Sequence, residues 1–188
     1  LDDDESAKDH KTSAYDIALM SRELLKHHPD IKKYTTIWMD TVRNGAFGLS
    51  NTNKLVRFYQ GATGLKTGFT SGAGYCLSAS AMREGMELVA VVMGCETSQK
   101  RFAACKAMLD YGFANYAVAD TKQLGLTMPE IPVRGGVESV VEPKEESAGF
   151  IVKKGNQNKV EYEIRAEEFL RAPVKEGQKI GEIIFRIE

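Results

Sequence analysis

The stretch Gly64-Leu65-Lys66-Thr67-Gly68-Phe69-Thr70 opens a series of strand and turn signals that decides the fold of this 188-residue chain. Ser71-Gly72-Ala73-Gly74 has the composition of a turn, and Tyr75 to Met82 has that of a strand. A second tight turn at Arg83-Glu84-Gly85 leads into another strand from Met86 to Met93. The pattern predicts an antiparallel meander with a Lys-Thr-Gly triplet on its first strand, beside the wall of a groove.

An amphipathic helix is predicted before the meander, from about residue 14 to residue 28. Ser13 is a good N-cap, and Asp16 stands three residues later, near the unpaired amides of the first turn. Pro29 stops the helix, and the preceding His27-His28 pair suits a helix C-terminus, where the dipole favours positive charge.

A second helix is predicted after the meander, from Thr97 or Ser98 to about Tyr111, with Gly112 ending it. Residues 115–121 read as a link. Beyond them, strict alternation at 160–165 and an apolar-rich run at 182–187 predict strands. The fold class is therefore α+β, with a first domain over residues 1–116 and an all-β domain over residues 117–188.

Composition excludes several classes of protein. The net charge is −1 with acids and bases interspersed, which gives no reason to expect a nucleic-acid partner, and Asp2-Asp3-Asp4-Glu5 suits a solvated loop. No stretch approaches the roughly 20 apolar residues that a membrane span needs. Cys76, Cys95 and Cys105 are expected to be free, buried thiols, and the histidines lack metal-ligand spacing, so no metal or other cofactor is predicted.

The Lys66-Thr67-Gly68 triplet matches one of the three motifs that build the acyl-transfer site of penicillin-binding proteins and serine β-lactamases. Taken alone, it equally fits a lysine that leads into a glycine turn. Residues 1 to about 187 as a whole resemble the C-terminal part of a low-molecular-weight penicillin-binding protein, a serine-type D-alanyl-D-alanine carboxypeptidase. The resemblance is carried by Ser13 to Ala18, Asn51 to Leu55, Gly64 to Thr70, Ala73 to Leu77 and Gln99 to Phe102.

The chain departs from this family in lacking two motifs. It contains neither the Ser-x-x-Lys that holds the nucleophile nor the Ser-x-Asn of the second motif. The nearest approaches are Ser98-Gln99-Lys100-Arg101 and Ser50-Asn51-Thr52. In the family both motifs precede the point that Leu1 matches. The chain is therefore expected to be a fragment with a partial transpeptidase domain, inert without the missing segment.

The resemblance implies a role for five residues. Lys66 would place a fixed cation beside the nucleophile, and Thr67 would offer its hydroxyl to a substrate carboxylate. Gly68 would let the substrate backbone approach, and the amide of Phe69 would donate one oxyanion-hole hydrogen bond. Arg101 would bind a free C-terminal carboxylate, the alternative being an ordinary exposed helix arginine.

Residues outside this set are expected to be structural. Asn51-Thr52-Asn53 would close a loop through hydrogen bonds from side chains to the backbone. Trp38, Phe58 and Tyr59 are more simply explained by buried aromatic packing than by a substrate groove.

The resemblance also implies substrates, partners and location. The parent enzyme would cleave peptidoglycan stem peptides ending in D-Ala-D-Ala, react with β-lactams, and work outside the cytoplasm. It would attach to the outer face of the cytoplasmic membrane through a C-terminal helix absent from this chain. One alternative is a non-catalytic cell-wall module on the same scaffold. The other is a serine β-lactamase, which the long β-rich C-terminal domain argues against. Exposed apolar surface and sheet edge would allow the fragment to dimerise.

Overall fold

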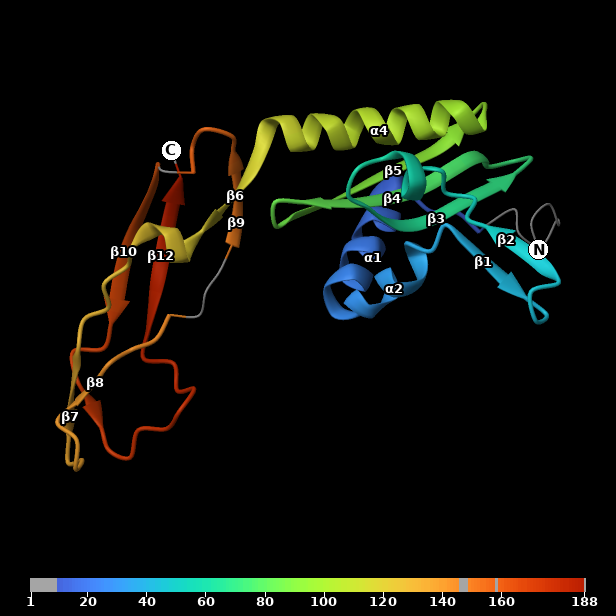
Figure 1. Cartoon of the computed structure of the whole chain (residues 1–188). Helices are drawn as coiled ribbons and strands as arrows, with labels where there is room; N and C mark the ends of the chain where they lie inside the picture. Colours follow the sequence, from blue (N-terminus) through green and yellow to red (C-terminus); the bar gives the residue numbers. More distant parts are fainter. Residues whose placement is uncertain (1–9, 146–148, 158, 188) are drawn as a thin grey trace. The chain divides into compact units, whose positions relative to one another are not determined.

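The computed structural model describes residues 10–145, 149–157 and 159–187, so the acidic run at 2–5 lies outside the described residues (Figure 1). Contacts divide the chain into two compact units, the first ending at Asn115 and the second beginning at Tyr116. Helices and antiparallel sheets are mixed, which confirms the α+β fold class. No helix within the described ranges is long and apolar enough to cross a membrane.

A three-stranded antiparallel sheet forms the centre of the first unit, as predicted. Its strands are β3 (Ala62–Thr70), β4 (Gly74–Arg83) and β5 (Met86–Cys95), in the order β3-β4-β5. Lys66 pairs with Ser78 across β3 and β4. Among the described residues β3 has a strand neighbour on one side, so its other edge is unpaired.

Helices cover both faces of this sheet (Figure 1). The helix α1 (Ala14–His27) and the short α2 (Lys32–Thr35), which follows the 3-10 turn η2 (Pro29–Ile31), lie on one face. The opposite face carries α4 (Ser98–Asn115). A capping box begins α1, since Ser13 Oγ accepts a hydrogen bond of 3.1 Å from the Asp16 amide and Asp16 accepts one from the Ser13 amide. The predicted start and end of this helix are confirmed.

The prediction that Gly112 ends the second helix is wrong, because α4 continues to Asn115. A Cβ at Gly112 would lie 2.4 Å from Leu88 Cδ1, so this glycine lets the helix approach β5 closely instead of capping it. The helix buries Cys105 and Leu109, as its spacing indicates, and also buries Arg101 and Phe113.

The cysteines are free, and only part of the prediction that they are buried holds. Cys105 is buried, and burial raises the pKa of its thiol to about 12. Cys76, near the start of β4, and Cys95, at the end of β5, are half-buried.

Small elements join α2 to the sheet. β1 (Met39–Val42) and β2 (Phe47–Ser50) form a hairpin whose turn places Arg43, Asn44 and Gly45 at positive φ. The short helix α3 (Leu55–Phe58) follows. The expectation of buried aromatic residues is wrong for Phe58, which is 71% exposed and meets Trp38 edge to face. Tyr59 is buried and donates a 2.8 Å hydrogen bond to Asp110.

The second unit consists of strands and one 3-10 turn within the described residues. The segment expected to be a link is a strand, β6 (Tyr116–Asp120), which pairs with β9 (Gly149–Lys153). The turn η3 (Thr121–Leu124) follows β6. β10 (Val160–Ala166) pairs with β12 (Gly181–Ile187), as the alternation at 160–165 predicts.

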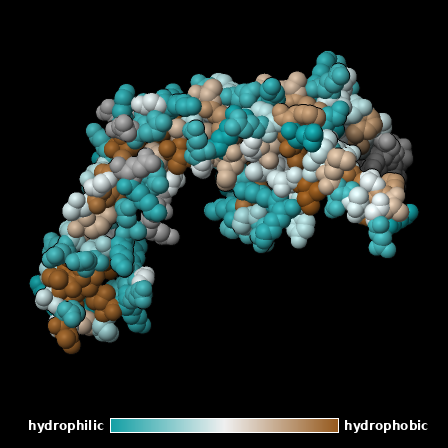
Figure 2. Space-filling view, viewed as in Figure 1, coloured by the Kyte–Doolittle hydropathy of each residue, from teal (hydrophilic) through white to brown (hydrophobic). Residues whose placement is uncertain are grey.

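The third sheet of this unit has the order β11-β7-β8, formed by β7 (Ile131–Arg134), β8 (Val140–Val141) and β11 (Leu170–Arg171). Ala119, Val152 and Val160 form a small core with Leu124, Phe150 and Phe185 around it. Figure 2 shows hydrophobic surface gathered near β7 and β8, where Val137 and Val140 are exposed.

Candidate active site

A cavity of about 420 Å³ lies along β3 and contains the Lys-Thr-Gly triplet. Lys66, Thr67 and Gly68 line it from β3, and Ser78 lines it from β4. Its remaining wall is mostly apolar and comes partly from α1, through Ile17, Met20 and Leu24, and α1 also contributes Ser21. Met20 and Leu24 are also exposed to solvent, so α1 presents part of its apolar stripe to this open space.

Lys66 is an exposed cation at this cavity. Its ammonium donates a hydrogen bond to the backbone carbonyl of Thr67. Two serines share the cavity wall with it, but Ser21 Oγ and Ser78 Oγ are buried and hydrogen-bond to each other at 2.8 Å. This pair joins α1 to β4 and has no Ser-x-x-Lys spacing, so it explains the packing of the helix.

Arg101 lies against the same strand from the other side of the sheet. It is only 7% exposed, which rules out an ordinary exposed helix arginine. Its Nη1 donates hydrogen bonds of 3.0 Å to the Gly68 carbonyl and 3.2 Å to the Cys76 carbonyl. The guanidinium also lies over the rings of Phe102 and Tyr75. Within the described residues its buried Nε has no hydrogen-bond partner.

The remaining predicted residues differ in their placement. Gly68 lines the cavity, and a Cβ there would meet Cys76 Cβ at an ordinary 3.8 Å, so the strand pairing itself does not require glycine. The Phe69 side chain is exposed and packs on Tyr75 at 4.4 Å between ring centroids. The structure therefore brings Lys66, Thr67 and Gly68 together and ties Arg101 to them through Gly68.

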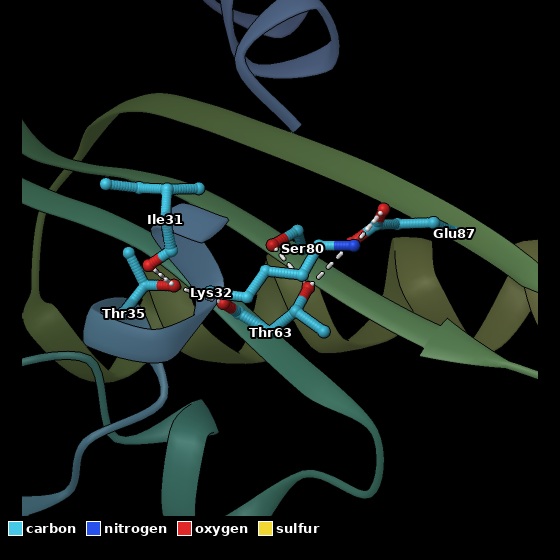
Figure 3. A network of polar contacts seen from close by, with 6 residues as sticks. All are labelled: Ile31, Lys32, Thr35, Thr63, Ser80 and Glu87. Atoms are coloured by element: carbon cyan, nitrogen blue, oxygen red, sulfur yellow. Dashed lines mark hydrogen bonds and ion pairs between the residues drawn. The ribbon is translucent and has the colours of Figure 1, made fainter. Parts of the chain in front are cut away.

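A polar network holds the start of β3 in place (Figure 3). Thr35 Oγ1 donates a 2.5 Å hydrogen bond to the Thr63 carbonyl. The Thr63 hydroxyl lies 2.7 Å from Ser80 Oγ and 3.1 Å from Glu87 Oε1, and Glu87 pairs with Lys32 at 2.7 Å. These half-buried contacts link α2 to all three strands, so they fix the strand that carries Lys66.

The loop before α3 adds a second anchor. Asn53 is 1% exposed, and its Nδ2 donates a 2.9 Å hydrogen bond to the Gly64 carbonyl while its Oδ1 accepts one from the Leu55 amide. Asn51 Nδ2 donates to the carbonyls of Thr35 and Ile37. The structural role predicted for these asparagines is confirmed.

Thr52 is the residue that sequence reasoning missed. It lies between the two anchoring asparagines, and its Oγ1 is 2.7 Å from the Oγ1 of Thr67. The contact joins residues 15 positions apart through a loop and a short helix. No local pattern signals such a contact, so only the fold reveals it.

Substitution of Gly64 by alanine is expected to lower the free energy of unfolding by roughly 2 kcal/mol. Gly64 has a φ of +152°, and a Cβ there would lie 2.9 Å from Thr35 Cβ. Urea denaturation followed by circular dichroism measures the change. Gly72→Ala is the matched control, because a Cβ at Gly72 meets nothing within 4 Å. Equal losses for both variants would contradict the close packing at Gly64.

Comparison with known proteins places this site in context. The family model described as D-alanyl-D-alanine carboxypeptidase matches residues 2–97. The D-alanyl-D-alanine carboxypeptidase DacF of Bacillus subtilis is 37% identical over 182 residues, which are 94% of this chain and 46% of that protein. The chain thus spans about half the length of the curated relatives it matches over most of its length.

Solved structures agree with these similarities. Penicillin-binding protein 5 from Haemophilus influenzae has a TM-score of 0.73 and 30% identity, over 94% of this chain and 52% of that one. Penicillin-binding protein D2 from Listeria monocytogenes, in its cefotaxime-bound form, has a TM-score of 0.52 and 36% identity, over 56% of this chain and 43% of that one.

Proposed function

The chain belongs to the D-alanyl-D-alanine carboxypeptidase family of low-molecular-weight penicillin-binding proteins, and from this premise we propose that it is the C-terminal part of a serine carboxypeptidase. The parent enzyme's serine would attack the carbonyl of the penultimate D-alanine in a peptidoglycan stem peptide. The terminal D-alanine would leave as the free amino acid, and water would then hydrolyse the serine ester. Penicillins would acylate the same serine.

The observation that carries this proposal is the Lys66-Thr67-Gly68 triplet on the edge strand of the sheet, lining a cavity and bonded through Gly68 to a buried arginine. The unpaired edge of β3 would let an extended peptide pair with it as an added strand. Gly68 would allow that peptide to approach, since it adds no side chain at the cavity wall.

Lys66, Thr67 and the amide of Phe69 have assigned roles in this proposal, as does Arg101. Lys66 would act as the catalytic cation beside the nucleophile and favour the active protonation state of the network around it. Thr67 would donate its hydroxyl to the substrate carboxylate. The backbone amide of Phe69 would donate one hydrogen bond to the oxyanion, the other coming from the amide of the nucleophile itself.

The proposed role of Arg101 is to bind the C-terminal carboxylate of the substrate at this end of the strand. Its charge is held 3.0 Å from the Gly68 carbonyl, and its Nε has hydrogen-bonding capacity left over. The guanidinium is nearly buried, so its field at the cavity is weakly screened by water.

The place of action proposed for the parent enzyme is outside the cytoplasm, at the peptidoglycan. Family membership supports this location, and the attachment to the membrane surface through a further C-terminal helix remains part of the proposal. The second unit would serve as a spacer or interaction surface that sets the catalytic domain at a distance from the membrane.

Labelling of the full-length gene product with a fluorescent penicillin tests the function, together with D-alanine release from a D-Ala-D-Ala peptide. We expect covalent labelling and release of one D-alanine per peptide cleaved. Release without labelling would contradict the serine mechanism, and fast penicillin turnover without D-alanine release would favour a β-lactamase. Absence of both reactions would favour the non-catalytic cell-wall module.

Replacing Arg101 by alanine in the full-length enzyme is expected to lower kcat/KM for a peptide with a free C-terminus about 30- to 1000-fold, which corresponds to roughly 2 to 4 kcal/mol for a desolvated charge-assisted contact. An amidated peptide has no C-terminal carboxylate to contact Arg101, so its hydrolysis, which is already slower, should change much less. Measurement of kcat/KM for both peptides, with the wild-type enzyme and with Arg101→Ala, gives the preference for the free C-terminus in each.

The control for this experiment addresses the packing role of Arg101, because its bonds to Gly68 and Cys76 also hold the strands. Arg101→Lys retains the positive charge and should recover part of the preference for the free C-terminus. Equal losses on the two peptides would show that Arg101 only supports the sheet.

A further inference from the structure

We infer that Thr52 is a positioning residue that orients the hydroxyl of Thr67 for carboxylate binding, an inference that rests on the proposed function. The two Oγ1 atoms are 2.7 Å apart, a normal distance for a hydrogen bond between hydroxyls. Thr52 is exposed, whereas Thr67 is 7% exposed, so the contact lies where β3 meets solvent.

The direction of this hydrogen bond decides what Thr67 can do. A hydroxyl has one proton to donate and two lone pairs that accept. If Thr67 donates to Thr52, its proton is unavailable to a substrate. If Thr52 donates to Thr67, the Thr67 proton is free for an incoming carboxylate. Because a carboxylate accepts and cannot donate, its arrival selects the second arrangement.

The position of Thr52 is fixed on both sides along the chain. Asn51 Nδ2 bonds to the carbonyls of Thr35 and Ile37, and Asn51 Oδ1 accepts a 2.9 Å hydrogen bond from the Asn53 amide. Asn53 Nδ2 bonds to the Gly64 carbonyl, three residues before Thr67. The loop is thus tied directly to the strand that it serves, so the Thr52 hydroxyl stays within reach of Thr67.

Because Thr52 contacts Thr67 and acts on the substrate only through it, loss of the Thr52 hydroxyl is expected to have a selective effect. Removing the Thr52 hydroxyl leaves Thr67 in place. It removes the donor that occupies one lone pair of the Thr67 oxygen and so favours the orientation in which the Thr67 proton is free. The loss should therefore fall on substrates whose carboxylate Thr67 binds, and it should appear mainly in KM. A purely structural role would instead change all substrates and the stability together.

Thr52→Val in the full-length enzyme tests the inference, since valine has the shape of threonine without its hydroxyl. We expect KM for a D-Ala-D-Ala peptide with a free C-terminus to rise about fivefold or more, as is typical for a lost neutral hydrogen bond. The rate of hydrolysis of the amidated peptide should stay within twofold of the wild-type rate. The midpoint of urea unfolding should be unchanged within error. Thr52→Ser restores a hydroxyl and should recover most of the affinity.

A double-mutant cycle with Thr67→Val supplies the second measurement. If Thr52 acts through Thr67, adding Thr52→Val to Thr67→Val should have no further effect on KM. Additive effects, or equal losses on the free and amidated peptides, would overturn the inference. If the wild-type enzyme turns over both peptides and Thr52→Val leaves the ratio of their KM values unchanged, this inference alone is overturned. A wild-type enzyme without peptide turnover would overturn the proposed function and this inference with it.

Discussion

Treatment of the 188-residue chain with a fluorescent penicillin is expected to leave it unlabelled, whereas the full-length protein should take up about one label per molecule. The reason is chemical. The chain has no Ser-x-x-Lys, and the serines that line the cavity with Lys66 are buried and bonded to each other. Oxyanion stabilisation and binding without a nucleophile leave only about 10³–10⁴-fold of catalysis over water.

The control for this experiment is the folded state of the chain, checked by a cooperative thermal transition before labelling. Labelling of the folded chain with a stoichiometry near one would contradict the prediction. Mass spectrometry of the labelled peptide would then decide between Ser21 and Ser78, the two serines that line the cavity with Lys66.

Local patterns predicted the frame of the first unit well. The capping box at Ser13 and the meander after Gly64 depend on neighbouring residues, so the sequence contains the whole signal. These elements needed no knowledge of distant contacts.

The errors came from residues whose role depends on distant partners. Gly112 looks like a helix terminator until Leu88 is found packed against it. The segment from Tyr116 to Asp120 resembles a link because its strand partner, β9, begins only at Gly149. Propensity along the chain cannot contain information about a partner that far away.

The candidate site divides in the same way. Motif resemblance identified Lys66 and Arg101, but the burial of Arg101 and its bond to Gly68 follow from the packing of α4 on the sheet. Asn51 and Asn53 each accept a hydrogen bond from the backbone amide two residues later, a local pattern that made their role in closing the loop predictable, and both also donate to carbonyls farther away in the chain. The Thr52 hydroxyl contacts Thr67, 15 positions away, and no local pattern indicates this contact.

Replacement of Lys66 by alanine in the full-length enzyme is expected to slow acylation by penicillin and by peptide alike, by about 10²–10⁴-fold, the usual contribution of a group that assists proton transfer. Lys66 lies on the cavity wall, and its ammonium donates a hydrogen bond to the backbone carbonyl of Thr67 on its own strand. Its loss removes the cation beside the nucleophile and leaves the substrate contacts of Thr67 in place. The effect should therefore fall on the acylation rate constant, with substrate affinity changed far less.

Stopped-flow measurement of acylation at several penicillin concentrations separates the rate constant from the affinity. Lys100→Ala is the matched control, because it removes the same charge from an exposed lysine next to Arg101 and should leave both quantities unchanged. Lys66→Arg retains the charge on a bulkier, planar group and should recover only part of the rate. If Lys66→Ala acylates at the wild-type rate, the cation on β3 has no part in the chemistry, and the catalytic assignment of the triplet fails.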